Sequence, residues 1–163
     1  MPTVLQVLSV AYVVFFLAVT LLPIEWSHEL SRWPGNRRAQ LVLVEPVVSA
    51  VLSDEHPLTA VAEVGGNVLM FVPFGCLLPL VLGSLDRGRR VVLVACCTSV
   101  LIELYQLRMP GIRRADVNDV LANTLGAALG WLALALVERW LARTGRPTLR
   151  QLARPDHAKR TPS

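Results

Sequence analysis

Four long apolar runs divide the chain, and each is long enough for a helix to cross a lipid bilayer. They cover residues 4–22, 64–82, 91–107 and 117–137. A transmembrane helix needs about 17 to 25 predominantly apolar residues. The first two runs contain no charged residue, whereas Glu103 lies within the third and Asp119 within the fourth. The pattern predicts an all-α integral membrane bundle of four transmembrane helices.

A longer loop, residues 23–63, separates the first two runs. It contains an apolar stretch, residues 41–52, which is broken by Glu45 and Pro46 and is too short to span a bilayer. Trp26 and Trp33 lie near the start of the loop, and aromatic rings of this kind favour the headgroup layer. We expect a short interfacial or re-entrant segment here, and the sequence leaves open whether it enters the membrane.

Composition supports a membrane protein and argues against nucleic-acid binding. The chain is 53% hydrophobic and 17% charged, whereas soluble domains have about 25% charged residues. Its net charge of +4 comes from arginines that flank the apolar runs and form no basic stripe interleaved with aromatics. The three cysteines lie inside apolar runs without the spacing of a zinc site. We therefore expect no nucleic-acid partner and no bound metal.

The distribution of cations predicts the orientation of the helices. Residues 83–90 and 138–163 together carry ten arginines and lysines, and the other two loops carry six. Cytoplasmic segments are enriched in these residues, so we expect both termini inside (N-in/C-in). We divide the chain into a transmembrane domain, residues 1–137, and a basic, largely disordered cytoplasmic tail, residues 138–163. The tail arginines have two interpretations: they keep the tail on the cytoplasmic side of the membrane, or they also contact anionic lipid.

The second, third and fourth runs each carry polar residues toward the end that this orientation places on the outer side. Asn67 lies near the start of the second run. In the third run, Ser99, Glu103 and Gln106 are spaced i, i+4 and i+7, which places them on one helix face. A carboxylate in the hydrocarbon layer costs at least about 2.5–3.5 kcal/mol. Glu103 is therefore expected to face the bundle interior, a partner or water.

The start of the fourth run carries the densest polar group. Asp116, Asp119 and Asn123 are spaced i, i+3 and i+7 on one face, and Gly126 and Gly130 continue that face deeper into the run. Glycines four residues apart allow a second helix to approach closely. Two interpretations fit the polar group: hydrogen bonds that hold the helices together, or a binding or reaction site.

Three linked segments resemble the signatures of the VanZ-like family, and the similarity extends over about residues 64–136. The segments are Asn67 to Gly75, Ser99 to Gln106 and Arg113 to Gly126. The motif positions are Asn67, Phe71, Pro73, Gly75, Ser99, Glu103, Gln106, Arg113, Asp116, Asp119, Asn123 and Gly126. The family is named for an accessory protein of glycopeptide-resistance clusters that is linked to teicoplanin resistance. The resemblance implies a multi-pass protein of the bacterial plasma membrane, active at the cell envelope, and implies no settled biochemical activity.

Our first functional hypothesis is a protein that binds or modulates a lipid-linked envelope component at the outer leaflet. Its partners would be membrane lipids and a lipid-linked cell-wall precursor. Carboxylates and amides suit hydroxyls, amides and amines, and an arginine suits a phosphate. The candidate binding residues are Asn67, Glu103, Gln106, Arg113, Asp116, Asp119 and Asn123.

The alternative is an intramembrane transferase or hydrolase that acts on a lipid-linked substrate. Glu103 would act as general acid or base, and Asp116 or Asp119 would orient the substrate or bind a divalent cation. No nucleophile stands out, and no other cofactor is expected. A small transporter is a third option, although four spans are few for one chain. The sequence leaves the ligand, the oligomeric state and any role in resistance open.

Overall fold

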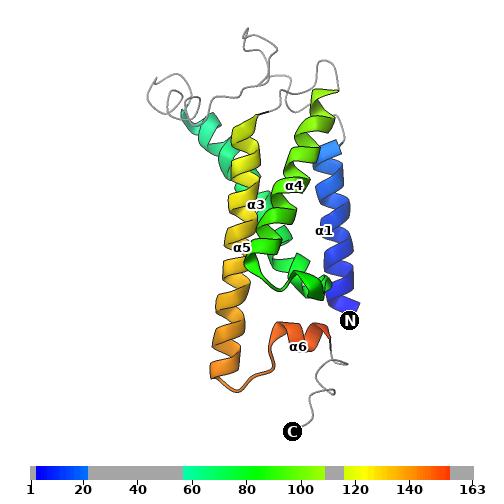
Figure 1. Ribbon diagram of the computed structural model, residues 1–163, viewed down its shortest axis with the longest axis vertical. Helices are drawn as coiled ribbons and strands as arrows, with labels where there is room; N and C mark the ends of the chain where they lie inside the picture. The colour runs from blue at the N-terminus through cyan, green and yellow to red at the C-terminus, as the bar shows by residue number, and fades with distance from the viewer. Residues whose placement is uncertain (1–2, 22–56, 109–115, 155–163) are drawn as a thin grey trace.

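The computed structural model describes residues 3–21, 57–108 and 116–154, and all regular structure in this part of the chain is helical (Figure 1). The helices are α1 (Thr3–Leu21), α3 (Pro57–Val81), the short 3-10 helix η2 (Gly83–Leu85), α4 (Gly88–Leu107), α5 (Val117–Arg143) and α6 (Leu149–Ala153). The four long helices lie side by side as a bundle, and α6 crosses beneath one end (Figure 1).

The long helices alternate in direction. α3 and α5 run the same way, and α1 and α4 run the opposite way (Figure 1). The starts of α3 and α5 therefore lie at the same end as the last turns of α1 and α4; we call this the polar end. The opposite end holds the start of α1, η2 and α6, and we call it the basic end. The start of the first described helix and the whole of the last thus lie at the same end, as an N-in/C-in chain requires. Which end faces the cytoplasm stays a prediction.

Length and composition identify three of the helices as candidate membrane spans. These are Val64–Val81 within α3, all of α4 and all of α5. The fourth, α1, is apolar over Val4–Thr20 but shorter, so its role as a span stays a prediction. Large apolar side chains also cover the outside of the bundle: Val4, Leu69, Leu93 and Leu101 are each more than 60% exposed. An apolar exterior on this scale suits lipid rather than water.

Two helix boundaries differ from the sequence prediction. α3 begins at Pro57, seven residues before the predicted span, and proline is tolerated in the first turn of a helix because its missing N–H would have no helical partner there. α3 also continues through Pro73 and Pro79. α5 continues past residue 137 to Arg143. The predicted interfacial segment, residues 41–52, lies outside the described residues.

The segment assigned by sequence to a largely disordered tail contains the end of α5 and all of α6. Gly145 adopts a left-handed conformation (φ 68°) and closes α5, with Arg146 N–H donating to the Leu141 carbonyl at 3.0 Å. Thr148 and Gln151 then cap α6 reciprocally, each side chain accepting from the other residue's backbone N–H. The Thr-x-x-Gln pattern that begins at Thr148 is a capping signal that the sequence prediction did not use.

Side-chain contacts hold α6 against the basic end of the bundle. The Arg154 guanidinium donates to the carbonyls of Pro79 and Leu80, at 3.1 and 3.3 Å, and so satisfies the end of α3. A Cβ on Gly83 would clash with Arg154, so glycine permits this approach. Arg150 forms an ion pair with Asp86 at 3.6 Å, across the connection to η2 and α4.

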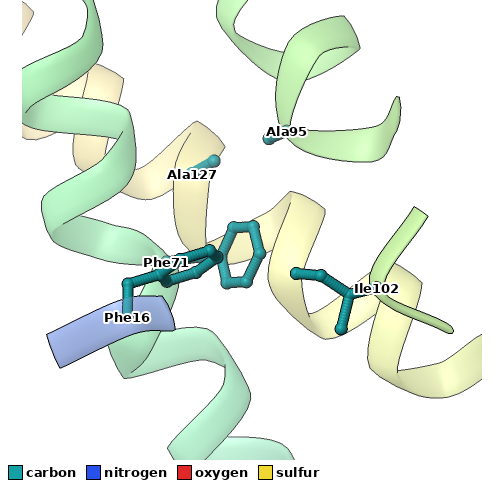
Figure 2. Packing of buried hydrophobic residues seen from close by; sticks show 5 residues of the cluster. All are labelled: Phe16, Phe71, Ala95, Ile102 and Ala127. Atoms are coloured by element: carbon teal, nitrogen blue, oxygen red, sulfur yellow. The ribbon is translucent and has the colours of Figure 1, made fainter. Parts of the chain in front are cut away.

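Aromatic rings join α1 to the other helices at the middle of the bundle (Figure 2). The ring of Phe16 in α1 meets Phe71 of α3 edge to face, with 5.2 Å between the centroids. Ile102 of α4 points toward these rings, and Ala127 of α5 completes the buried cluster (Figure 2). The Tyr12 hydroxyl also donates to the Met70 carbonyl at 2.9 Å. Every long helix therefore contributes to one core.

The closest packing is between α3 and α5, where glycines allow the two backbones to touch. A Cβ on Gly126 would clash with the carbonyl of Val68, and a Cβ on Gly130 would clash with the carbonyl of Val72. From the other side, a Cβ on Gly75 would clash with the carbonyl of Ala127. The small-residue ridge predicted at Gly126 and Gly130 is therefore confirmed, and its partner is α3.

We predict that Gly126→Ala destabilises the protein by about 1–3 kcal/mol, because α3 and α5 must separate to admit the methyl group. Gly65→Ala is the matched control, since nothing lies within 4 Å of the Cβ position there. The control also measures the helix propensity of alanine, which is about 0.8–1 kcal/mol more favourable than that of glycine. The free energy of unfolding in mixed detergent micelles is measured for both variants. Equal stability of Gly126→Ala and the wild type would contradict the close contact.

Candidate functional site

The polar end of the bundle is held by a direct bond between α3 and α5. The Asn67 side-chain amide donates to the Asp119 carboxylate, with 2.6 Å between Nδ2 and Oδ1. Both side chains are partly buried. A bond between an amide and a carboxylate is stronger than one between neutral groups and is expected to be short. Two of the predicted site residues, 52 positions apart in the chain, are therefore in contact.

The third helix, α4, presents its predicted polar face to the bundle interior. Ser99 is fully buried, and Glu103 and Gln106 are each 7% exposed. Leu101 and Leu104, on the other side of α4, are more than half exposed. The i, i+4, i+7 spacing thus predicted the buried face correctly. A polar face that points inward on an apolar helix avoids the cost of placing carboxylate and amide groups in lipid.

Glu103 connects α4 to the start of α5. One of its carboxylate oxygens, Oε2, accepts from the backbone N–H of Asp116 at 2.9 Å. Asp116 is itself the N-cap of α5, and its Oδ1 accepts from both the backbone N–H and the side-chain amide of Asn118, each at 2.8 Å. An N-cap satisfies backbone donors that the helix itself leaves unpaired. These contacts explain Asp116 as a structural residue without requiring a ligand.

One turn deeper than Asp119, Asn123 lies against Ser99. Its amide donates to the Ser99 hydroxyl at 2.8 Å, and the whole residue is 4% exposed. Its carbonyl oxygen, Oδ1, is buried and has no hydrogen-bond partner among the residues that the structure describes. A buried amide oxygen left unpaired is unfavourable. Asn123 Oδ1 is therefore an unsatisfied acceptor inside the bundle among the described residues.

Six of the seven predicted binding residues lie at the polar end, and Arg113 lies outside the described residues. Asn67 and Asp119 bond each other, Glu103 bonds the start of α5, and Asn123 bonds α4. Gln106 is buried on the same face of α4 as Glu103. The arrangement supplies amide and carboxylate groups that can bind hydroxyl, amide or amine groups. Within the described ranges, no three histidine, cysteine or carboxylate side chains are grouped as a metal site would require.

Sequence reasoning missed two residues with structural roles, Asn118 at this end and Tyr12 at the middle of the bundle. Asn118 was not among the predicted site residues, yet it is 8% exposed and donates to the Asp116 side chain that caps α5. An aspartate directly before a helix, followed two residues later by a side-chain donor, was the available signal. Tyr12 was predicted only as part of an apolar run, although a buried tyrosine hydroxyl needs a partner and finds an acceptor on α3.

A double-mutant cycle should detect the Asn67–Asp119 bond. We predict that Asn67→Ala and Asp119→Ala are coupled by about 1 kcal/mol in unfolding free energy, in the range measured for side-chain bonds between membrane helices. Thr124→Ala is the control partner for Asn67→Ala, because the Thr124 hydroxyl donates to Val120 of its own helix. That control cycle should give no coupling, and additivity in the test cycle would mean that the bond does not form.

Comparison with known proteins agrees with the motifs. The family model described as VanZ/LLP1 matches residues 9–138, which include all of α3 and α4 and most of α1 and α5. No curated protein and no solved structure matches the chain. The family match covers well over half of the sequence and contains every residue of the polar end described above. The chain is a membrane protein of the VanZ/LLP1 family.

Proposed function

We propose that the polar end binds the head of a lipid-linked envelope component at the outer leaflet of the plasma membrane. The convergence of Asn67, Asp119 and Glu103, delivered by three separate helices to one end, carries this proposal. A scaffold alone needs hydrogen bonds between helices, but it does not need an acceptor left unpaired. Asn123 Oδ1 is such an acceptor among the described residues.

The outward direction of the polar end rests on the charge of the opposite end. Cytoplasmic segments retain arginine, and the basic end carries arginines in both the η2 connection and the α5–α6 segment. The polar end then lies toward the outer leaflet, where the heads of lipid-linked wall precursors are exposed. This position also connects the protein to glycopeptide drugs such as teicoplanin, which act on such precursors outside the cell. A change in the availability of the precursor would change susceptibility.

We expect the purified protein in lipid nanodiscs to bind a labelled lipid-linked cell-wall precursor saturably. Asn123→Leu keeps the branching of the side chain but removes both the unpaired acceptor and the amide that donates to Ser99. It should weaken binding about three- to tenfold, the equivalent of one hydrogen bond. Asp86→Asn, a change at the basic end, is the control and should bind as the wild type does. Absence of saturable binding, or equal affinity for Asn123→Leu and the wild type, would contradict the proposal.

The same assay distinguishes binding from catalysis. Glu103 is the residue that an intramembrane transferase or hydrolase would use, because it is a buried carboxylate that accepts from the backbone N–H of Asp116. In Glu103→Gln an amide oxygen can still accept from Asp116 N–H, so the contact that joins α4 to α5 is kept while acid–base chemistry is lost. Turnover of the precursor, with magnesium supplied, that disappears in Glu103→Gln would favour an enzyme over a binding protein.

A further inference from the structure

The basic end of the bundle has far more positive than negative charge. In residues 82–90 and 138–154, the sequence contains eight arginines and two carboxylates, Asp86 and Glu138. The arginines are Arg87, Arg89, Arg90, Arg139, Arg143, Arg146, Arg150 and Arg154. Such an excess at one end of a membrane bundle attracts anionic groups.

The few internal partners at this end are used to hold α6. Asp86 pairs with the Arg150 guanidinium at 3.6 Å, and the Glu138 carboxylate accepts from the Arg150 backbone N–H at 3.0 Å. Arg154 binds the carbonyls at the end of α3. Both carboxylates are therefore engaged around α6. No carboxylate within the described ranges remains near enough to pair with the arginines at the end of α5.

Those arginines are exposed and lie beside apolar anchors. Arg139 and Arg143 are one helical turn apart at the end of α5, and Arg146 follows the turn at Gly145. The Arg146 guanidinium lies 5.5 Å from the centre of the Trp140 ring, which is 54% exposed. On α6, Leu149 and Leu152 are exposed although Ala153 is buried. An exposed tryptophan and leucines next to arginines match the layer between lipid tails and headgroups.

We propose that the end of α5 and α6 form a binding surface for the headgroup of an anionic phospholipid in the leaflet opposite the polar end. Arg139, Arg143 and Arg146 would contact the phosphate and its negative charge, while Trp140 and Leu152 lie among the upper acyl chains. The docking of α6 by Arg150 and Arg154 fixes the position of these apolar residues relative to the arginines. The surface is separate from the polar end, so it goes beyond the proposed binding of an envelope precursor.

Native mass spectrometry of the detergent-solubilised full chain tests this surface. The protein is titrated with phosphatidylglycerol or with phosphatidylcholine carrying the same acyl chains. We expect phosphatidylglycerol to bind at least about fivefold more tightly, since even one arginine near an anionic headgroup contributes on the order of a fivefold gain. Equal binding of the two lipids by the wild type would overturn the proposal.

Two triple variants locate the effect. Changing Arg139, Arg143 and Arg146 together to glutamine should remove the preference for phosphatidylglycerol, whereas changing the same three to lysine should keep most of it because the charge remains. Arg108→Gln, at the polar end, is the matched control and should keep the full preference. A glutamine triple variant that folds and still prefers phosphatidylglycerol would place the lipid elsewhere and overturn the assignment. Thermal unfolding of each variant confirms that it is folded.

Discussion

The direct contact between the backbones of α3 and α5 is the constraint on which the rest of the bundle depends. Gly126 and Gly130 leave room for the carbonyls of Val68 and Val72, and Gly75 leaves room for Ala127 in return. Membrane helices gain no hydrophobic free energy by leaving lipid, so they associate through close packing and polar bonds. Glycine provides that packing here, and Cys76 adds a bond from its thiol to the Gly130 carbonyl at 3.1 Å.

The polar end follows from this contact because it fixes two parallel helices at short range. Only at that range does Asn67 reach Asp119, and only with α4 packed against α5 does Asn123 reach Ser99. The buried groups are thereby paired within the protein rather than exposed to lipid. The one buried acceptor left unpaired among the described residues of this end, Asn123 Oδ1, is the observation on which the proposed binding site rests.

The sequence predicted the faces of the helices better than their partners or ends. The spacing of Ser99, Glu103 and Gln106 determines a common face in any helix, and expelling them from lipid turns that face inward. The partner of the glycine ridge was not predictable, because a groove of small residues accepts any helix. The order of residues 138–154 depends on Arg154 reaching the distant end of α3, and local signals such as Gly145 carry no information about that contact.

The pairing of Asn67 with Asp119 is most directly tested by cysteine cross-linking in native membranes. Cys76, Cys96 and Cys97 are first replaced by alanine, and Asn67→Cys is combined with Asp119→Cys under mild oxidation. The structure predicts an intramolecular disulfide, detected by mass spectrometry, and none when Leu69→Cys replaces Asn67→Cys, because Leu69 is 71% exposed on the outside of α3. A cross-link formed by Leu69→Cys but not by Asn67→Cys would contradict the inward convergence of the polar end.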